Sequence, residues 1–251
     1  MNPVDIAKSL YDQYYVSPAA GGEPHVSSHW KYYGSQFRVK FNPDGSPVEL
    51  NGIGFGDMMG RDPIQTVLSY LCHLSYLIRL PHRVDILKFC IPAMSVCRRM
   101  GAFFSFDCFK QVCSWALIHR HLTARMKSAR LNILVIGDGY GFMACLIKSI
   151  LPNSTLVLVD LGKTLTFQAH YCPRVFPGCR HALGPASGDA GYLDFIYCPA
   201  EDFETLNLRF DIGINIVSMQ EMNPETIQRY FTFMRRRFHP DHLFYCCNRE
   251  S

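Results

Sequence analysis

Several features are missing from this sequence of 251 residues, and each absence argues against a class of protein. Charged residues make up only 18% of the chain, the formal net charge is +4, and there is no extended basic run. A surface that binds nucleic acid normally needs clustered lysine and arginine. Only Arg98–Arg99 and Arg235–Arg237 approach such a cluster, and both lie in stretches with helical periodicity. We interpret them as solvated helix faces, and binding of nucleic acid is not expected.

Targeting and membrane signals are also missing. Met1–Leu10 contains Asp5 and Lys8 and lacks the apolar run of a secretory signal peptide. No stretch approaches the roughly 18 consecutive apolar residues that a membrane-spanning helix needs. We therefore expect a cytoplasmic protein without a membrane span.

Cysteine is abundant, with eleven residues, but no C-x-x-C pair occurs. Cysteines stand in apolar runs such as Phe89–Ile91, which predicts reduced, buried thiols in place of a disulfide framework. One group combines ligand types that suit zinc, but its spacing matches no zinc finger or ribbon, so we predict no metal site. This group consists of His170, Cys172, Cys179 and His181.

Composition divides the chain into three zones. The amino-terminal zone, residues 1–60, is rich in glycine, proline and aromatic residues and has no long helical pattern, which predicts an irregular extension. Short strands are expected at 37–41 and 48–50, joined by a turn at Asn42–Gly45.

The helical zone, residues 61–130, predicts a cap or lid of three helices. The first begins at Pro63 and has an apolar pattern that continues to Ile78. The second follows Pro81–His82, and Pro92 should kink or break it. The third is expected from near Asp107 to about Met126.

The α/β zone, residues 131–251, alternates short apolar runs with amphipathic helices. This alternation predicts an α/β fold with a Rossmann-like, mostly parallel sheet flanked by helices. A helix that starts at Pro224 and is capped by Asn223 precedes the last strand. The expected strands are 133–136, 155–159, 193–197, 210–217 and 243–247, and the other expected helices are 142–151 and 163–171.

A glycine-rich turn, G-D-G-Y-G at 137–141, joins the first strand to its helix. Glycines allow a sharp turn and a close approach of the backbone to a ligand, and open α/β sheets bind ligands at this edge. Asp160 ends the next strand, where an acidic side chain accepts hydrogen bonds from ribose hydroxyls. A dinucleotide site would instead have G-x-G-x-x-G and a pyrophosphate at the helix amino terminus. S-adenosylmethionine has no phosphate, so the turn favours that cofactor.

Four segments strengthen this interpretation: I-G-D-G-Y-G-F, V-L-V-D-L-G-K-T, F-D-I-G-I-N-I-V-S-M-Q-E-M and L-F-Y-C-C-N-R. They resemble segments of a bacterial family of sugar O-methyltransferases. The resemblance covers residues 131–251 and, more loosely, His29–Trp30 and Gly52–Gly56. It implies a class I, S-adenosylmethionine-dependent methyltransferase that acts on a sugar or another small hydroxyl-bearing acceptor. In such enzymes an acid after the third strand lies near the adenine amino group, and Ala200–Asp202 occupies that place.

These observations yield a set of expected site residues. Glu221 is the first candidate for the base that removes the acceptor proton, with Gln220 orienting the hydroxyl. His25, His29 and His170 are second-line candidates for the base. The predicted cofactor-binding residues are Gly137, Asp138, Gly139, Gly141, Asp160, Leu161, Glu201, Asp202, Ser218 and Met219.

The chain departs from typical class I methyltransferases in two places. An acid usually stands two positions before the first glycine, where it contacts the methionine amino group; here that residue is Val135, and Asp138 is the candidate substitute. Two closing strands usually follow the fifth, but none is predicted here. The strand 243–247 lacks the charges or proline that protect a free edge. We expect residues 1–60 or a second subunit to cover it.

Two alternatives remain open. The chain could be a non-catalytic interaction protein on a degenerate methyltransferase fold, which Val135 and the missing strands favour. It could also be an NAD-dependent oxidoreductase or epimerase, although it lacks the phosphate turn and a Tyr-x-x-x-Lys pair after the fourth strand.

Overall fold

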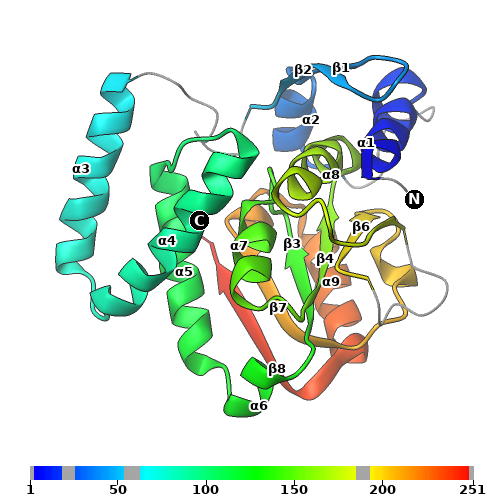
Figure 1. Ribbon diagram of the computed structural model, residues 1–251. Helices are drawn as coiled ribbons and strands as arrows, with labels where there is room; N and C mark the ends of the chain where they lie inside the picture. Colours follow the sequence, from blue (N-terminus) through cyan, green and yellow to red (C-terminus); the bar gives the residue numbers. More distant parts are fainter. Residues whose placement is uncertain (1–2, 19–25, 54–62, 185–192, 249–251) are drawn as a thin grey trace.

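The computed structural model describes residues 3–18, 26–53, 63–184 and 193–248. Its centre is a six-stranded, all-parallel sheet flanked by helices, which confirms the predicted Rossmann-like α/β fold (Figure 1). The strand order is β5-β6-β4-β3-β7-β8. The strands are β3 (Asn132–Ile136), β4 (Thr155–Asp160), β5 (His181–Leu183), β6 (Phe195–Pro199), β7 (Phe210–Ile216) and β8 (Phe238–Cys247).

Alternate residues of each strand are buried on opposite faces of the sheet. Ile133 and Val135 belong to the larger core cluster, which the helices α1 (Pro3–Tyr11), α4, α5, α7 and α8 share. Leu134 and Ile136 belong to a second cluster with side chains of α9. Burial on both faces explains the continuous apolar runs in the sequence. The remaining bounds are α4 (Arg83–Met100), α5 (Phe106–His121), α7 (Phe142–Ile150), α8 (Gly162–Val175) and α9 (Pro224–Arg237).

The sheet differs from the expected one at its margins. The three-residue strand β5 was not predicted, because so short a run has no detectable period. The strand expected at 193–197 begins at Phe195, and β8 begins at Phe238, five residues before its predicted start.

The helical zone contains α3 (Pro63–Arg79), α4, α5 and the short α6 (Ala124–Ser128). Pro92 lies inside α4, which continues to Met100, so of the two predicted effects, a kink or a break, the break does not occur. The third predicted helix is divided: α5 ends at His121, and the Thr123 side chain accepts a hydrogen bond from the Met126 amide to start α6.

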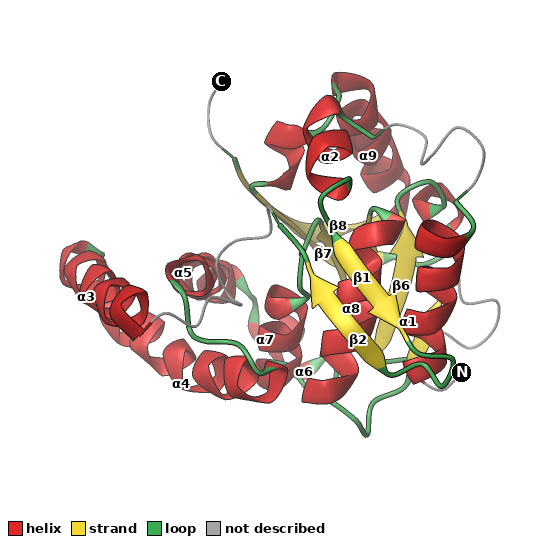
Figure 2. Cartoon of the chain, turned by 90° about the horizontal axis from the view of Figure 1, so that it is seen from above, coloured by secondary structure: helices red, strands yellow, loops and turns green. Residues whose placement is uncertain are grey.

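The amino-terminal zone is more helical than predicted. It forms α1, a π-helical turn (Asp12–Val16), α2 (Ser28–Gly34) and an antiparallel hairpin of β1 (Arg38–Phe41) and β2 (Pro47–Asn51). Ile6 and Leu10 of α1 are fully buried against the core, so α1 packs on α8 and beside β5 (Figure 2).

This placement corrects the prediction that the amino-terminal zone covers the edge of β8. Strands β5 and β8 lie at opposite edges of the sheet. Because α1 packs beside β5, it lies at the edge opposite to β8. Strand β8 instead contacts the helical zone, where the Tyr245 hydroxyl donates to Ser114 Oγ of α5 at 3.1 Å.

Of the described helices, none is both long and apolar enough to cross a lipid bilayer.

All eleven cysteines are free in the structure. Cys97 Sγ and Cys108 Sγ lie 3.8 Å apart, compared with about 2.05 Å in a disulfide. Burial raises the pKa of the Cys90 and Cys113 thiols to about 11, which suppresses the reactive thiolate.

We therefore predict eleven free thiols by mass spectrometry after alkylation in denaturant without reductant. In the native protein the exposed Cys72, Cys246 and Cys247 should be alkylated first, because buried thiols are shielded and protonated. Two missing alkyl groups per cysteine pair in the protein alkylated without reductant would contradict this prediction.

Candidate functional site

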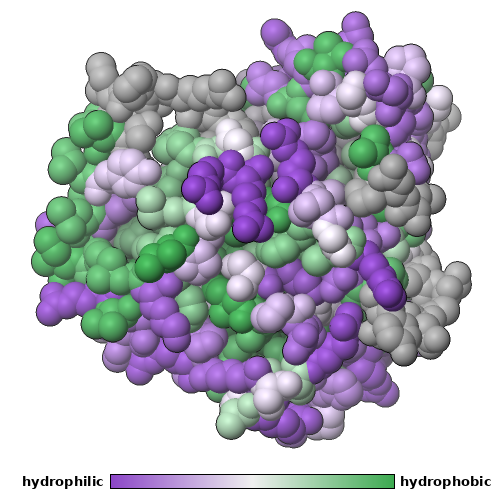
Figure 3. Space-filling view, in the orientation of Figure 1, coloured by the Kyte–Doolittle hydropathy of each residue, from purple (hydrophilic) through white to green (hydrophobic). Residues whose placement is uncertain are grey.

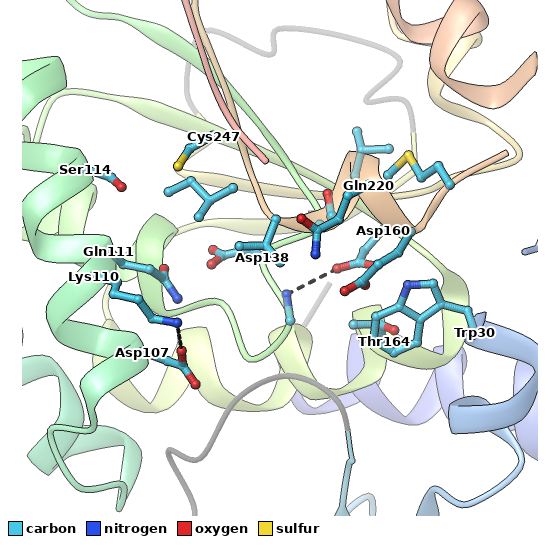
Figure 4. A pocket seen from close by; sticks show the side chains of 18 of the residues that line it. Trp30, Asp107, Lys110, Gln111, Ser114, Asp138, Asp160, Thr164, Gln220 and Cys247 are labelled. Atoms are coloured by element: carbon cyan, nitrogen blue, oxygen red, sulfur yellow. Dashed lines mark hydrogen bonds and ion pairs between the residues drawn. The ribbon is translucent and has the colours of Figure 1, made fainter. Parts of the chain in front are cut away.

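A cavity of about 690 Å³ lies at the carboxyl ends of β3, β4 and β7 (Figure 4). The chain passes from β3 to β4, then to β5 at the edge and β6 beside it, and finally returns to β7 on the other side of β3. The glycine turn after β3 therefore lies at the point where the strand order reverses, which is where open α/β sheets bind ligands. Helix α5 forms one wall, and Trp30 of α2 lies on the opposite side (Figure 4).

The glycine turn requires glycine for conformation and for space. Gly137, Gly139 and Gly141 have φ of 73°, 63° and 84°, in the left-handed region that favours glycine. A Cβ on Gly137 would lie 2.3 Å from Ser218 Oγ, and one on Gly141 would lie 2.7 Å from Cys172 Sγ. Gly137 and Gly139 line the cavity, whereas Gly141 caps α7 and does not.

Asp138 lines the cavity and also caps α7. Its Oδ1 accepts a hydrogen bond from the Met143 amide at 3.0 Å, and its Oδ2 accepts one from the Ala144 amide at 2.8 Å. Burial raises the pKa of this carboxyl to about 7, although the two amide bonds act in the opposite direction. The Asp138 carboxylate thus accepts hydrogen bonds from the backbone amides of Met143 and Ala144, and these amides do not donate to a ligand.

Asp160 holds the glycine turn from the end of β4. Its Oδ2 accepts from the Gly139 amide at 3.3 Å and from Gln168 Nε2 at 2.7 Å, and its Oδ1 accepts from the Leu161 amide at 2.8 Å. Burial, with a smaller contribution from the nearby Asp138, raises its pKa to about 7, although the three hydrogen bonds act in the opposite direction. Asp160 and Leu161 both line the cavity.

The turn after β7 is tied to β3 by buried polar groups. Asn215 Nδ2 donates to the Ile136 carbonyl at 3.1 Å, and Ser218 Oγ donates to the same carbonyl at 3.1 Å. Val217 has φ of 70°, which is strained for a β-branched residue and is often found at binding sites. Ser218 lines the cavity, but the Met219 side chain packs in the core cluster with α9.

Both predicted catalytic residues, Gln220 and Glu221, line the cavity. The backbone amide of Gln220 donates to Asn248 Oδ1 at 3.2 Å, which fixes the turn to the end of β8. Glu221 Oε2 lies 3.6 Å from His29 Nε2 of α2. The structure therefore brings together two candidates that the sequence offered separately as bases.

Other predicted residues lie elsewhere. Glu201 accepts a hydrogen bond from the Tyr14 hydroxyl, and neither it nor Asp202 lines the cavity, although the adjacent Ala200 does. His170 packs against aromatic rings of the amino-terminal zone and α8, away from the cavity, and burial lowers its pKa to about 4. His25 lies outside the described residues.

The zinc-type residues serve other contacts. Cys172 packs against Gly141, and His181 Nδ1 lies 2.9 Å from the Tyr197 hydroxyl. Within the described part of the chain, no three histidine, cysteine or acidic side chains converge in a way that could hold a metal ion.

The sequence analysis missed much of the cavity wall. Helix α5 contributes four polar residues at helical spacing, Asp107, Lys110, Gln111 and Ser114, and the first two form an ion pair (Figure 4). The spacing i, i+3, i+4, i+7 marks one helix face and could have identified them. Thr226, at the start of α9, also lines the cavity. Its buried Oγ1 has no hydrogen-bond partner among the described residues, so it can accept or donate to a ligand.

No protein-family model matches the chain, and no curated protein matches it. A functional interpretation therefore depends on the residues of the cavity and on their geometry.

Proposed function

We propose that the chain is an S-adenosylmethionine-dependent methyltransferase that transfers a methyl group to a hydroxyl of a small acceptor, of which a sugar is one class. The observation that carries the proposal is the convergence of the glycine turn, Asp160 and Glu221 on one cavity. Its volume of about 690 Å³ falls in the range that holds a cofactor and a small substrate.

The environment of the glycine turn supports a cofactor without phosphate. In a dinucleotide site the amides at the helix amino terminus bind a pyrophosphate. Here the Asp138 carboxylate already accepts from the amides of Met143 and Ala144. These amides are therefore not free to bind a pyrophosphate, which would also face the two carboxylates of Asp138 and Asp160. A cationic sulfonium compound would be attracted to both, which favours the methyltransferase over the NAD-dependent alternative.

The residues present fit the cofactor. The glycines leave the backbone open to the ligand, and Asp160 can accept from ribose hydroxyls. The unpartnered Thr226 Oγ1 offers a further polar contact. When bound, the cofactor supplies an electrophilic methyl group on a sulfonium.

The catalytic work of the chain is to hold the acceptor and take up its proton. Glu221 is the base in this proposal, because its carboxylate lines the cavity. Gln220 orients the hydroxyl by hydrogen bonding. His29 Nε2 of α2 lies 3.6 Å from Glu221 Oε2, where a protonated imidazole would form an ion pair with the carboxylate.

Calorimetry with S-adenosylhomocysteine tests the proposal directly, with NAD as the matched ligand. Binding of the first and not the second supports a methyltransferase. Binding of NAD alone indicates an oxidoreductase. Binding of neither supports the interaction protein with a degenerate cofactor site.

Affinity for S-adenosylmethionine should rise about tenfold from pH 6 to pH 8 if binding requires one ionised carboxylate with a pKa of about 7. The positive ligand binds the ionised form, which is the minor form at pH 6. Calorimetry across this range measures the slope, and Asp160→Asn should flatten it. A flat profile in the parent protein would contradict the role of these acids.

Stability of the unliganded protein should change in the opposite direction. The carboxyls of Asp138 and Asp160 bind protons more tightly in the folded chain, where their pKa is about 7, than at the ordinary value of 3.8. Their contribution to stability is therefore complete below about pH 4 and is lost as the pH rises through about 7. Thermal unfolding with and without the cofactor separates the two effects.

A further inference from the structure

Helices α3 and α4 expose apolar side chains in two regular rows. On α3 the row is Val67, Leu71, Leu74 and Ile78, with side chains between 54% and 63% exposed. On α4 the row is Val84, Leu87, Ile91 and Met94, between 49% and 76% exposed. We call these the α3 row and the α4 row. Figure 3 shows apolar side chains gathered on the side of the molecule where α3 lies.

The spacing within each row is that of a helix–helix seam. Successive residues are separated by four, three and four positions in the α3 row, and by three, four and three in the α4 row. A repeat of this kind places apolar side chains along one stripe that packs against another helix. The two rows span 11 and 10 residue steps, or roughly 15–17 Å each at 1.5 Å per residue. They match in length and spacing.

We propose that the α3 and α4 rows form a homodimer interface, in which this helix pair of one chain packs against the same pair of a second copy. One chain carries two rows of equal length, which suits the self-complementary contact of a twofold dimer. Each of the eight residues is at least 49% exposed, and burial of such apolar surface is the main favourable contribution to association.

A lipid surface fits α3 less well than a second copy does. Helices that lie on membranes carry lysine and arginine on their polar face. Helix α4 contains Arg83 and Lys88, but α3, which carries the other row, has no charged residue before Arg79. The edge of β8, where the sequence suggested a subunit contact, exposes no comparable row: none of the large apolar side chains exposed among the described residues belongs to β8.

The interface would also reach the candidate active site. Tyr76, within the span of the α3 row, and Leu80, just beyond its end, line the cavity. Helix α3 contacts its own chain chiefly through α4 and α5. A second copy packed on the α3 row would therefore fix one wall of the cavity.

Sedimentation and light scattering of the full chain test the dimer. The parent protein should have about twice the monomer mass of 28.7 kDa at tens of micromolar and should dissociate on dilution. Leu71→Glu and Ile91→Glu should each shift the mass to that of a monomer, because each places a charge in the seam. Both positions are exposed in the monomer, so far-ultraviolet circular dichroism should stay unchanged.

Val48→Glu is the matched control, since Val48 is similarly exposed but lies on β2. It should leave the dimer intact. A parent protein that is monomeric at every concentration would overturn the proposal whatever the variants do. So would a dimer that survives both charged substitutions. Binding of a monomeric parent to anionic vesicles would replace the dimer with a membrane contact.

Discussion

Replacement of Gly139 by valine should abolish binding of S-adenosylhomocysteine. Gly139 has φ of 63°, lines the cavity and donates its amide to Asp160. A β-branched residue strongly disfavours this backbone angle, and its side chain would project where the backbone must approach the ligand. We expect calorimetry to show no heat of binding in a variant that remains folded.

Backbone strain alone could lower stability, so this prediction needs a matched control. Gly184 has φ of 78°, but it does not line the cavity, and a Cβ there would meet no atom of the described residues within 4 Å. Gly184→Val should therefore carry a similar strain and keep its affinity for the ligand. Unchanged affinity in a folded Gly139→Val variant would remove the glycine turn from the site.

Asp160→Ala should weaken binding of the cofactor by roughly 1.5–3 kcal/mol, which corresponds to an increase of about 10- to 150-fold in the dissociation constant. This is the effect expected for loss of a hydrogen bond to a charged group. The carboxylate accepts from Gly139, Leu161 and Gln168, so the substitution removes a support of the turn together with the proposed contact to the ligand. Asp160→Asn, which keeps the shape but not the charge, should retain part of the affinity.

The control for Asp160 is Asp202→Ala. Sequence analysis placed Asp202 in the same site, but in the structure it is exposed and does not line the cavity. Its loss should leave the affinity unchanged in calorimetry. An equal loss of affinity in the two variants would show that general charge, and not the geometry of Asp160, controls binding.

The local parts of this site follow from the sequence because they depend on neighbouring residues. A buried strand that ends in G-D-G-Y-G and leads into a helix can form only a tight turn, and three positive φ angles bear this out. Asp160 is the last residue of β4, which pairs in parallel with β3 and places Val159 opposite Ile136. Parallel strands bring their carboxyl ends to one edge, so the chain itself determines that the two meet.

The direction of individual side chains was not determined locally. Glu201 was expected to face the cofactor, but it accepts a hydrogen bond from the Tyr14 hydroxyl and does not line the cavity. Asp138 does line the cavity, but both of its carboxylate oxygens also cap α7. A carboxylate satisfies the nearest unpaired donors, and which donors are nearest depends on packing. Met219 similarly lies in the core, because the turn after β7 directs it toward α9.

Tertiary structure alone decided the walls of the cavity and the place of the amino-terminal zone. Lys110, Trp30 and Thr226 are far apart in the sequence, and no local period relates them. The apolar face of α1 could have packed on either edge of the sheet, and the fit of Ile6 and Leu10 against α8 selects the β5 side. The sequence thus determined the parallel sheet and its ligand-binding edge through local periodicity and turn geometry. Long-range burial determined what surrounds that edge, because the free energy of packing depends on surfaces that meet only in the folded chain.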